Sequence, residues 1–122
     1  MAADYVARAS RYAPTQMMEL KPGSRTDLWA KHPTAKKILL DPAGKAMESN
    51  AFAELFRRAE MLGHDLVFVI GGHEGLPEEW RKKADLLVSL SAMTMPHELA
   101  RAVLAEQIYR AFTILRGHPY PR

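Results

Sequence analysis

Two short segments of the chain carry residue types that could hold a small ligand. Gly71-Gly72-His73-Glu74-Gly75 directly follows an apolar run, and glycines in such a place let the backbone approach a ligand closely. Leu90–His97 is neutral and mostly apolar, with the hydroxyls of Ser91 and Thr94, which suits an uncharged or zwitterionic ligand better than a polyphosphate. The glycine segment has neither the Walker nor the dinucleotide-binding spacing, and a Gly-Gly pair after a strand also often forms only a turn.

Metal and covalent chemistry find little support in the sequence. The five histidines show no tight ligand spacing with one another, so we predict no metal site on His32, His64, His73, His97 or His118. The chain has no cysteine and no Gly-x-Ser-x-Gly segment. A covalent hydrolase is therefore not expected.

Strand and helix patterns alternate along the chain and would position these two segments. Apolar runs predict strands at 37–40, 66–70 and 85–90, with a weaker candidate at 16–20. Apolar spacing predicts helices at 3–12, about 50–62, 77–83 and 96–115. This order predicts an α/β fold with a largely parallel sheet.

Local signals set the expected element ends. Ser49 or Asn50 can cap the second helix, and Gly63 suits the position just after its end. Asp41-Pro42-Ala43-Gly44 has turn chemistry and is expected to close the first strand, while residues 21–35 are expected to be mostly loop. Leu66–Ile70 is typical of a strand buried on both faces of a sheet.

The last helix is apolar around much of its circumference. One stripe consists of Leu99, Val103, Leu104, Ile108, Phe112 and Leu115, and a second, adjacent stripe consists of Ala102, Ala105 and Tyr109. A second subunit could cover the second stripe, or the helix could lie deep in its own core. The pattern alone favours neither interpretation.

Composition narrows the class of protein. The chain has 122 residues, 48% of them hydrophobic and 25% charged, which predicts one globular domain spanning 1–122. No apolar run approaches a membrane span, and the N-terminal residues lack the apolar stretch of a signal peptide. We therefore expect neither a membrane protein nor a secreted precursor.

The net charge of +3 arises entirely within residues 1–64. There, Lys21, Arg25, Lys31, Lys36 and Lys37 surround Trp29 with Asp27 as the only acid among them. Clustered bases around an aromatic ring suit a nucleic-acid backbone with an unstacked base nearby. A solvated loop whose lysines maintain solubility explains the same cluster, and charged loops are common enough to favour that interpretation.

Three segments resemble motifs of the RlmH family, the large-subunit rRNA pseudouridine-N3-methyltransferases of the SPOUT (α/β-knot) superfamily. They are Leu66–Gly75, Leu90–His97 and Glu106–Ala111, and Leu40-Asp41 with Gly44-Lys45 fits in register. The resemblance implies a parallel sheet with flanking helices and a C-terminal trefoil knot. It also implies a cytoplasmic homodimer with an active site shared between subunits. The expected substrate is 23S rRNA in the assembled ribosome, with free rRNA as the alternative.

The resemblance further implies the site residues. S-adenosylmethionine, without a metal, would be held by the loops after three strands, at Leu40, Gly71, Gly72, Leu90, Ser91, Ala92, Met93, Thr94 and Met95. On the C-terminal tail, Tyr120 and Arg122 are the catalytic candidates, with His118 a weaker one. A cation near the target base would stabilise the anion formed when its N3–H is lost.

Two departures from the family pattern leave alternatives open. The family's first strand is missing before the helix at 3–12, and Pro121 stands where the family tail commonly has histidine. A catalytically impaired, dimeric relative that binds rRNA or ribosomes and S-adenosylmethionine is therefore the alternative function. A different small nucleotide-binding α/β module is a remote third.

Overall fold

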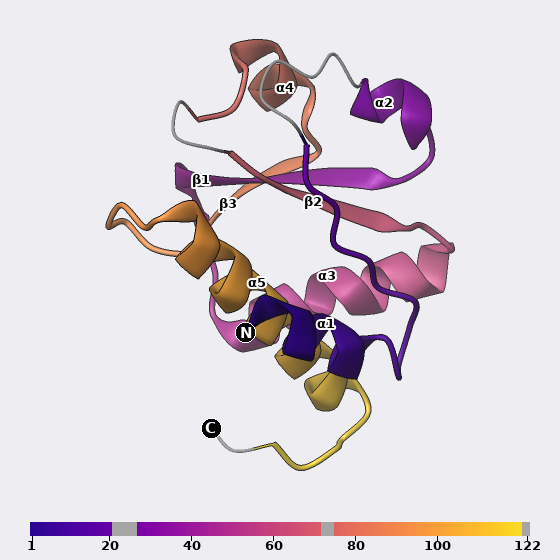
Figure 1. Cartoon of the computed structure of the whole chain (residues 1–122). Coiled ribbons are helices and arrows are strands. Elements are labelled where there is room, and N and C mark those ends of the chain that lie inside the picture. Colours follow the sequence, from indigo (N-terminus) through magenta and orange to yellow (C-terminus); the bar gives the residue numbers. More distant parts are fainter. Residues whose placement is uncertain (21–26, 72–74, 121–122) are drawn as a thin grey trace.

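A parallel three-stranded sheet lies at the centre of the computed structural model, which describes residues 1–20, 27–71 and 75–120 (Figure 1). The strands are β1 (Lys36–Ala46), β2 (Leu66–Ile70) and β3 (Leu86–Ser89), and β1 lies between the other two. Both of its neighbours run parallel to it. The predicted α/β class with a parallel sheet is therefore confirmed.

Helices cover both faces of the sheet (Figure 1). On one face lie α1 (Ala2–Ala9), α3 (Ser49–Leu62) and α5 (His97–Leu115), and on the other lie α2 (Leu28–Lys31) and α4 (Glu78–Lys83). None of the helices in the described ranges has the length and apolarity to cross a membrane. The chain is thus a three-layer arrangement with one apolar core on each side of the sheet.

Strand β2 shows why both faces need cover, because its side chains alternate between the two cores. Phe68 packs on Phe52 and Phe56 of α3, with ring centroids 5.5 and 5.7 Å away, whereas Val69 packs with Leu39 on the α2–α4 side. The predicted burial on both faces of the sheet is confirmed, although only Val69 of this strand is fully buried and the other four residues are partly exposed. The reason is that β2 lies at the edge of the described sheet.

Strand β1 is longer than predicted but is interrupted where the turn was expected. Its ladder with β3 slips, so that Leu40 and Lys45 both pair with Val88, and the four residues between them bulge out. Gly44 permits the return, because a Cβ there would lie 2.7 Å from the carbonyl carbon of Leu87. Turn chemistry at 41–44 therefore produces a bulge within the strand rather than its end.

Helix α3 confirms the prediction at its C-terminus and corrects it at its N-terminus. Gly63 has φ 72° in the left-handed region, and the His64 N–H donates to the Ala59 carbonyl at 2.9 Å. Neither Ser49 nor Asn50 caps the start, where Glu48 is the N-cap residue without a side-chain bond. The Ser49 hydroxyl instead donates to Gln107 Oε1 at 2.9 Å, which ties α3 to α5.

The N-terminal region differs further from expectation. The strand predicted at 16–20 is absent, and the exposed Met17 and Met18 find no strand to pair with among the described residues. Residues 28–31, expected to be loop, form the single turn of α2, because the Asp27 carboxylate accepts bonds from the N–H groups of Trp29 and Ala30. The remaining helices and strands lie where the sequence predicts them, within one to three residues at each end.

Helix α5 places most of its first stripe in the core, with Leu104 and Phe112 buried, but Leu99 in its first turn is 50% exposed. The second stripe is largely covered by the same chain, since Tyr5 and Tyr12 pack on Tyr109 with ring centroids 6.1 and 6.3 Å away. The stripe pattern by itself therefore no longer argues for a partner subunit. The predicted homodimer stays a prediction.

Candidate functional site

The ends of the three strands bring most of the predicted ligand residues to one edge of the sheet. Leu40 on the central strand pairs with Ile70 on one side and Val88 on the other. Gly71 follows Ile70 directly, and Leu90 lies two residues after Val88. Leu40, Gly71 and Leu90 are thus neighbours at the carboxyl edge, the usual place for a ligand in a parallel α/β sheet.

The loop after β3 is shaped by its own hydroxyls. Ser89 Oγ donates to the Ser91 carbonyl at 3.0 Å, and Ser91 Oγ accepts the Met93 N–H at 3.0 Å. Ala92, Met93 and Thr94 are exposed, with Met93 exposed by 78%, and Met95 is half-buried. The predicted loop 90–95 is therefore a folded turn whose apolar tip is available for contact.

The loop after β2 is tight at its base. A Cβ on Gly71 would lie 2.9 Å from the Gly75 carbonyl carbon and 3.0 Å from Leu76 Cγ. Glycine is thus needed at position 71 by the close approach of the chain to itself. Gly72, the other glycine predicted to bind the cofactor, lies outside the described residues.

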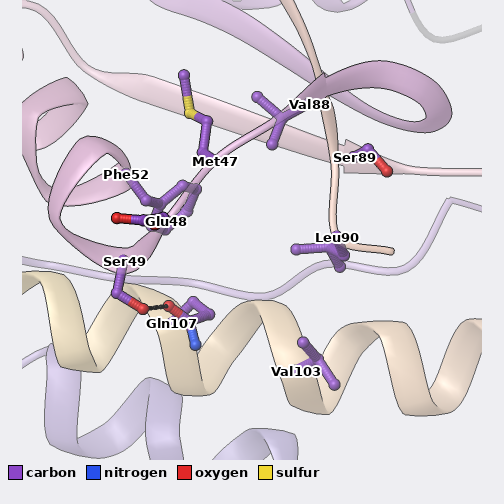
Figure 2. A pocket seen from close by; sticks show the side chains of 9 residues that line it. All are labelled: Met47, Glu48, Ser49, Phe52, Val88, Ser89, Leu90, Val103 and Gln107. Carbon is purple, nitrogen blue, oxygen red and sulfur yellow. Dashed lines mark hydrogen bonds between the residues drawn. The ribbon is translucent and has the colours of Figure 1, made fainter. Parts of the chain in front are cut away.

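A cavity of about 380 Å³ adjoins this edge (Figure 2). Of the predicted ligand residues that the structure describes, Leu90 alone lines this cavity. The sequence did not predict the other lining residues, which are Met47, Glu48, Ser49, Phe52, Val88, Ser89, Val103 and Gln107. Figure 2 shows the bond between Ser49 and Gln107 bridging α3 and α5 along one side. A signal for Gln107 existed, because it lies within the third motif, 106–111. Nothing marked Met47 and Glu48 beyond their place before a helix.

The lining could accept a ligand with both apolar and polar parts. Phe52, Val88 and Leu90 supply apolar walls, while the hydroxyl of Ser89 and the carboxylate of Glu48 supply polar atoms. No three histidine, aspartate or glutamate side chains of the described ranges are grouped closely enough to hold a metal ion. The site as built is suited to organic ligands.

The C-terminal tail packs on its own chain. The Tyr120 ring stands edge-on to Tyr109 at 4.9 Å, and the guanidinium of Arg110 lies over it at 4.7 Å. Burial and a hydrogen bond with Tyr5 raise the pKa of Tyr120 above its ordinary value. At neutral pH the phenol is therefore a proton donor and not a base.

The other tail candidates differ in their surroundings. His118 is exposed, with its ring centroid 6.3 Å from that of Tyr12, and its backbone N–H donates to the Thr113 carbonyl at 2.9 Å. Arg122 lies outside the described residues. Neither Tyr120 nor His118 lines the cavity of the same chain.

The basic segment around Trp29 is engaged only in part inside the protein, since Lys31 and Lys36 are exposed. Lys37 is only 2% exposed and donates to the His32 carbonyl, while Lys36 Nζ lies 3.8 Å from Asp85 Oδ1. Lys31 is exposed, and Lys21 and Arg25 lie outside the described residues. Of the three lysines that the structure describes in this segment, only Lys37 therefore has a structural role in the core.

A parallel sheet with glycine- and hydroxyl-bearing loops at its carboxyl edge, beside a cavity, defines an α/β protein with a candidate site for a small molecule. Residues 1–121 match the family described as predicted SPOUT methyltransferase. The chain is 66% identical over its whole length to the "Ribosomal RNA large subunit methyltransferase H" of Solibacter usitatus, covering 87% of that protein. It is 42% identical to the protein of the same name from Thermus thermophilus, over 98% of this chain and 84% of that one. The Chromobacterium violaceum protein of that name is 40% identical, over 98% and 86%.

The chain therefore belongs to the SPOUT methyltransferase family. This confirms the resemblance carried by the three motifs, and with it the predicted class of enzyme.

Proposed function

We propose that this protein transfers a methyl group from S-adenosylmethionine to N3 of a pseudouridine in the large-subunit rRNA. The observation that carries the proposal is the meeting of three motif-bearing strand ends, at Leu40, Gly71 and Leu90, on one edge of the sheet. The names of its relatives, which are large-subunit rRNA methyltransferases, support the substrate.

The residues at this edge fit S-adenosylmethionine. The cofactor has an apolar purine face and a zwitterionic amino-acid end, and the edge offers an apolar loop tip at Met93 beside the polar and apolar walls of the cavity. Gly71 keeps side-chain atoms out of the narrow base of the second loop. When bound, the cofactor supplies a methyl group already activated on a sulfonium, so the protein's task is chiefly positioning.

The tail residues supply the remaining chemistry in this proposal. Tyr120 holds its proton at neutral pH and is suited to donate a hydrogen bond to, or stack on, the target base. Arg122 would stabilise the negative charge on the ring after the N3 proton is lost, and His118 is a weaker candidate for the same role. Because Tyr120 does not line its own chain's cavity, we propose that it serves the partner's site in a cytoplasmic homodimer. The trefoil knot and the absence of the family's first strand stay predictions.

The proposal is tested by transfer of tritium from methyl-labelled S-adenosylmethionine to ribosomes that lack the modification. We expect label in large-subunit rRNA with wild-type protein and none after Gly71→Val, which fills the base of the cofactor loop. Calorimetric titration with S-adenosylmethionine distinguishes the proposed enzyme from the alternative function, because a catalytically impaired relative would bind the cofactor but transfer no label. Absence of both binding and transfer in the wild type would refute the proposal.

A further inference from the structure

The bulge that follows Leu40 is held by one acidic side chain. Asp41 Oδ1 accepts the Ala43 N–H at 2.8 Å, which folds the bulge back on itself. Asp41 Oδ2 lies 3.0 Å from Arg81 Nε, across from helix α4. One carboxylate thus shapes the bulge and joins it to a helix 40 positions further along the chain.

The ion pair between Asp41 and Arg81 is less exposed to solvent than the second ion pair of α4, which Arg81 makes with Glu78. The Asp41 side chain is 16% exposed and that of Arg81 is 35% exposed, whereas Glu78, which also approaches Arg81 at 3.4 Å, is 67% exposed. The Arg81 Nε atom is buried, and its N–H is not aligned well enough with the Asp41 carboxylate to form a hydrogen bond. The contact is therefore an ion pair without a hydrogen bond. Pairs shielded in this way are screened less by salt and solvent than exposed ones.

The place of Arg81 in the fold links two of the candidate cofactor loops. Helix α4 begins three residues after Gly75, at the end of the glycine loop. Its Trp80 packs in the core with Leu39 and Val69, which fixes the helix to the sheet. Arg81, next to Trp80, therefore extends from an anchored element to the bulge at 41–44.

We propose that Asp41 and Arg81 form a positioning pair that sets the exit of β1 relative to helix α4 and so pre-forms the cofactor site. Neither residue is a catalytic group. The pair keeps Leu40 and the bulge in the conformation that binds the cofactor, so that less ordering is required on binding. This inference rests on the proposed function for the identity of the ligand, S-adenosylmethionine.

Calorimetric titration with S-adenosylmethionine tests the pair in the full chain. Asp41→Asn keeps the acceptor for the Ala43 N–H but removes the charge, and Arg81→Met removes the guanidinium but keeps much of the stem. We expect each to raise the Kd by about tenfold, and the double variant to raise it no further, because both remove the same interaction. Arg81→Lys, which keeps the charge, should recover part of the affinity.

The matched control is Arg116→Met. It removes an ion pair of similar length, 2.8 Å, between Arg116, which directly follows α5, and Glu60 of α3. That pair joins the C-terminal end of α5 to α3 and lies outside the bulge at 41–44 and helix α4, so the Kd should stay at the wild-type value. Equal effects of Arg81→Met and Arg116→Met on the Kd would show that the Asp41–Arg81 pair contributes only to overall stability, and this would overturn the inference.

Amide hydrogen exchange of residues 41–46, measured without any cofactor, separates this inference from the proposed function. Arg81→Met should speed exchange of these amides about tenfold while leaving those of α3 unchanged. Unchanged exchange at 41–46 overturns the inference even if the wild type binds the cofactor. If the wild type fails to bind S-adenosylmethionine, the proposed function fails, and the role assigned to the pair in cofactor binding is overturned with it.

Discussion

Replacing Gly44 with alanine should damage both the fold and the ligand site. A Cβ at this position would lie 2.7 Å from the carbonyl carbon of Leu87 and 2.8 Å from both the Leu87 oxygen and the Val88 nitrogen. All three are backbone atoms of β3, so no side-chain rotation can relieve the overlap. Either β3 moves away from β1 or the bulge at 41–44 changes its path.

The magnitude follows from the kind of overlap. Overpacking against a rigid neighbour destabilises a protein by about 1–3 kcal/mol, and contact with backbone favours the upper end. For 122 residues, 1 kcal/mol corresponds to a Tm change of about 4 °C, so we expect a loss of about 8–12 °C. Urea unfolding followed by circular dichroism gives the change in free energy directly, and calorimetry gives the change in affinity for S-adenosylmethionine.

Gly63→Ala is the matched comparison. A Cβ there meets nothing within 4 Å, but φ is +72°, so the variant should lose about 1 kcal/mol through backbone strain alone. Gly63 ends α3 and is not part of the cavity wall, so cofactor affinity should not change. A Gly44→Ala protein with wild-type Tm and affinity would refute the assigned packing of the bulge on β3.

Three further predictions concern the buried ring of Phe112, the contact between Tyr5 and Tyr120, and the C-terminal tail. Phe112→Ala, at a buried ring that packs on Phe56 and Tyr12, should lower the free energy of unfolding by about 3–5 kcal/mol in urea titrations, and a loss below 1 kcal/mol would contradict its place in the core. Tyr5→Phe removes the hydrogen bond that helps to raise the pKa of Tyr120, so this pKa should fall toward about 10 in ultraviolet titrations. Because the pKa is raised in the folded state, Tyr120 contributes stability that is present below about pH 10 and is lost as the pH rises. The variant should therefore lose less stability than the wild type over that rise in pH. Deleting residues 120–122 should abolish methyl transfer but spare cofactor binding in calorimetry, and full transfer by the truncated protein would place the catalytic groups elsewhere.

Much of the fold was predictable because local signals and global packing agree. Gly63 ends α3 where its left-handed conformation is needed, and the apolar run at 66–70 forms a parallel strand. The errors arose where a side chain or a neighbouring element outweighs local propensity. Ser49 bonds to Gln107 across the core instead of capping its helix, and the turn residues at 41–44 return to the same strand because β3 offers a second pairing at Val88.

The site was predictable only as far as the motifs reach. The sequence placed Leu40, Gly71 and Leu90 at strand ends, and parallel pairing brings them together. It did not reveal Met47 and Glu48, which lie in the cavity wall where the chain passes from the end of β1 to the start of α3. Nor did it reveal Arg81, whose role depends on a contact between residues 40 positions apart.

The central claim is tested most directly by identifying the nucleoside that receives the methyl group. Ribosomes lacking the modification are incubated with the wild-type protein and S-adenosylmethionine, and the large-subunit rRNA is digested to nucleosides and analysed by mass spectrometry. The account predicts one new species, a pseudouridine methylated at N3, that is absent when the target pseudouridine is replaced by uridine. A methyl group on any other nucleoside, or none despite tight cofactor binding, would contradict it.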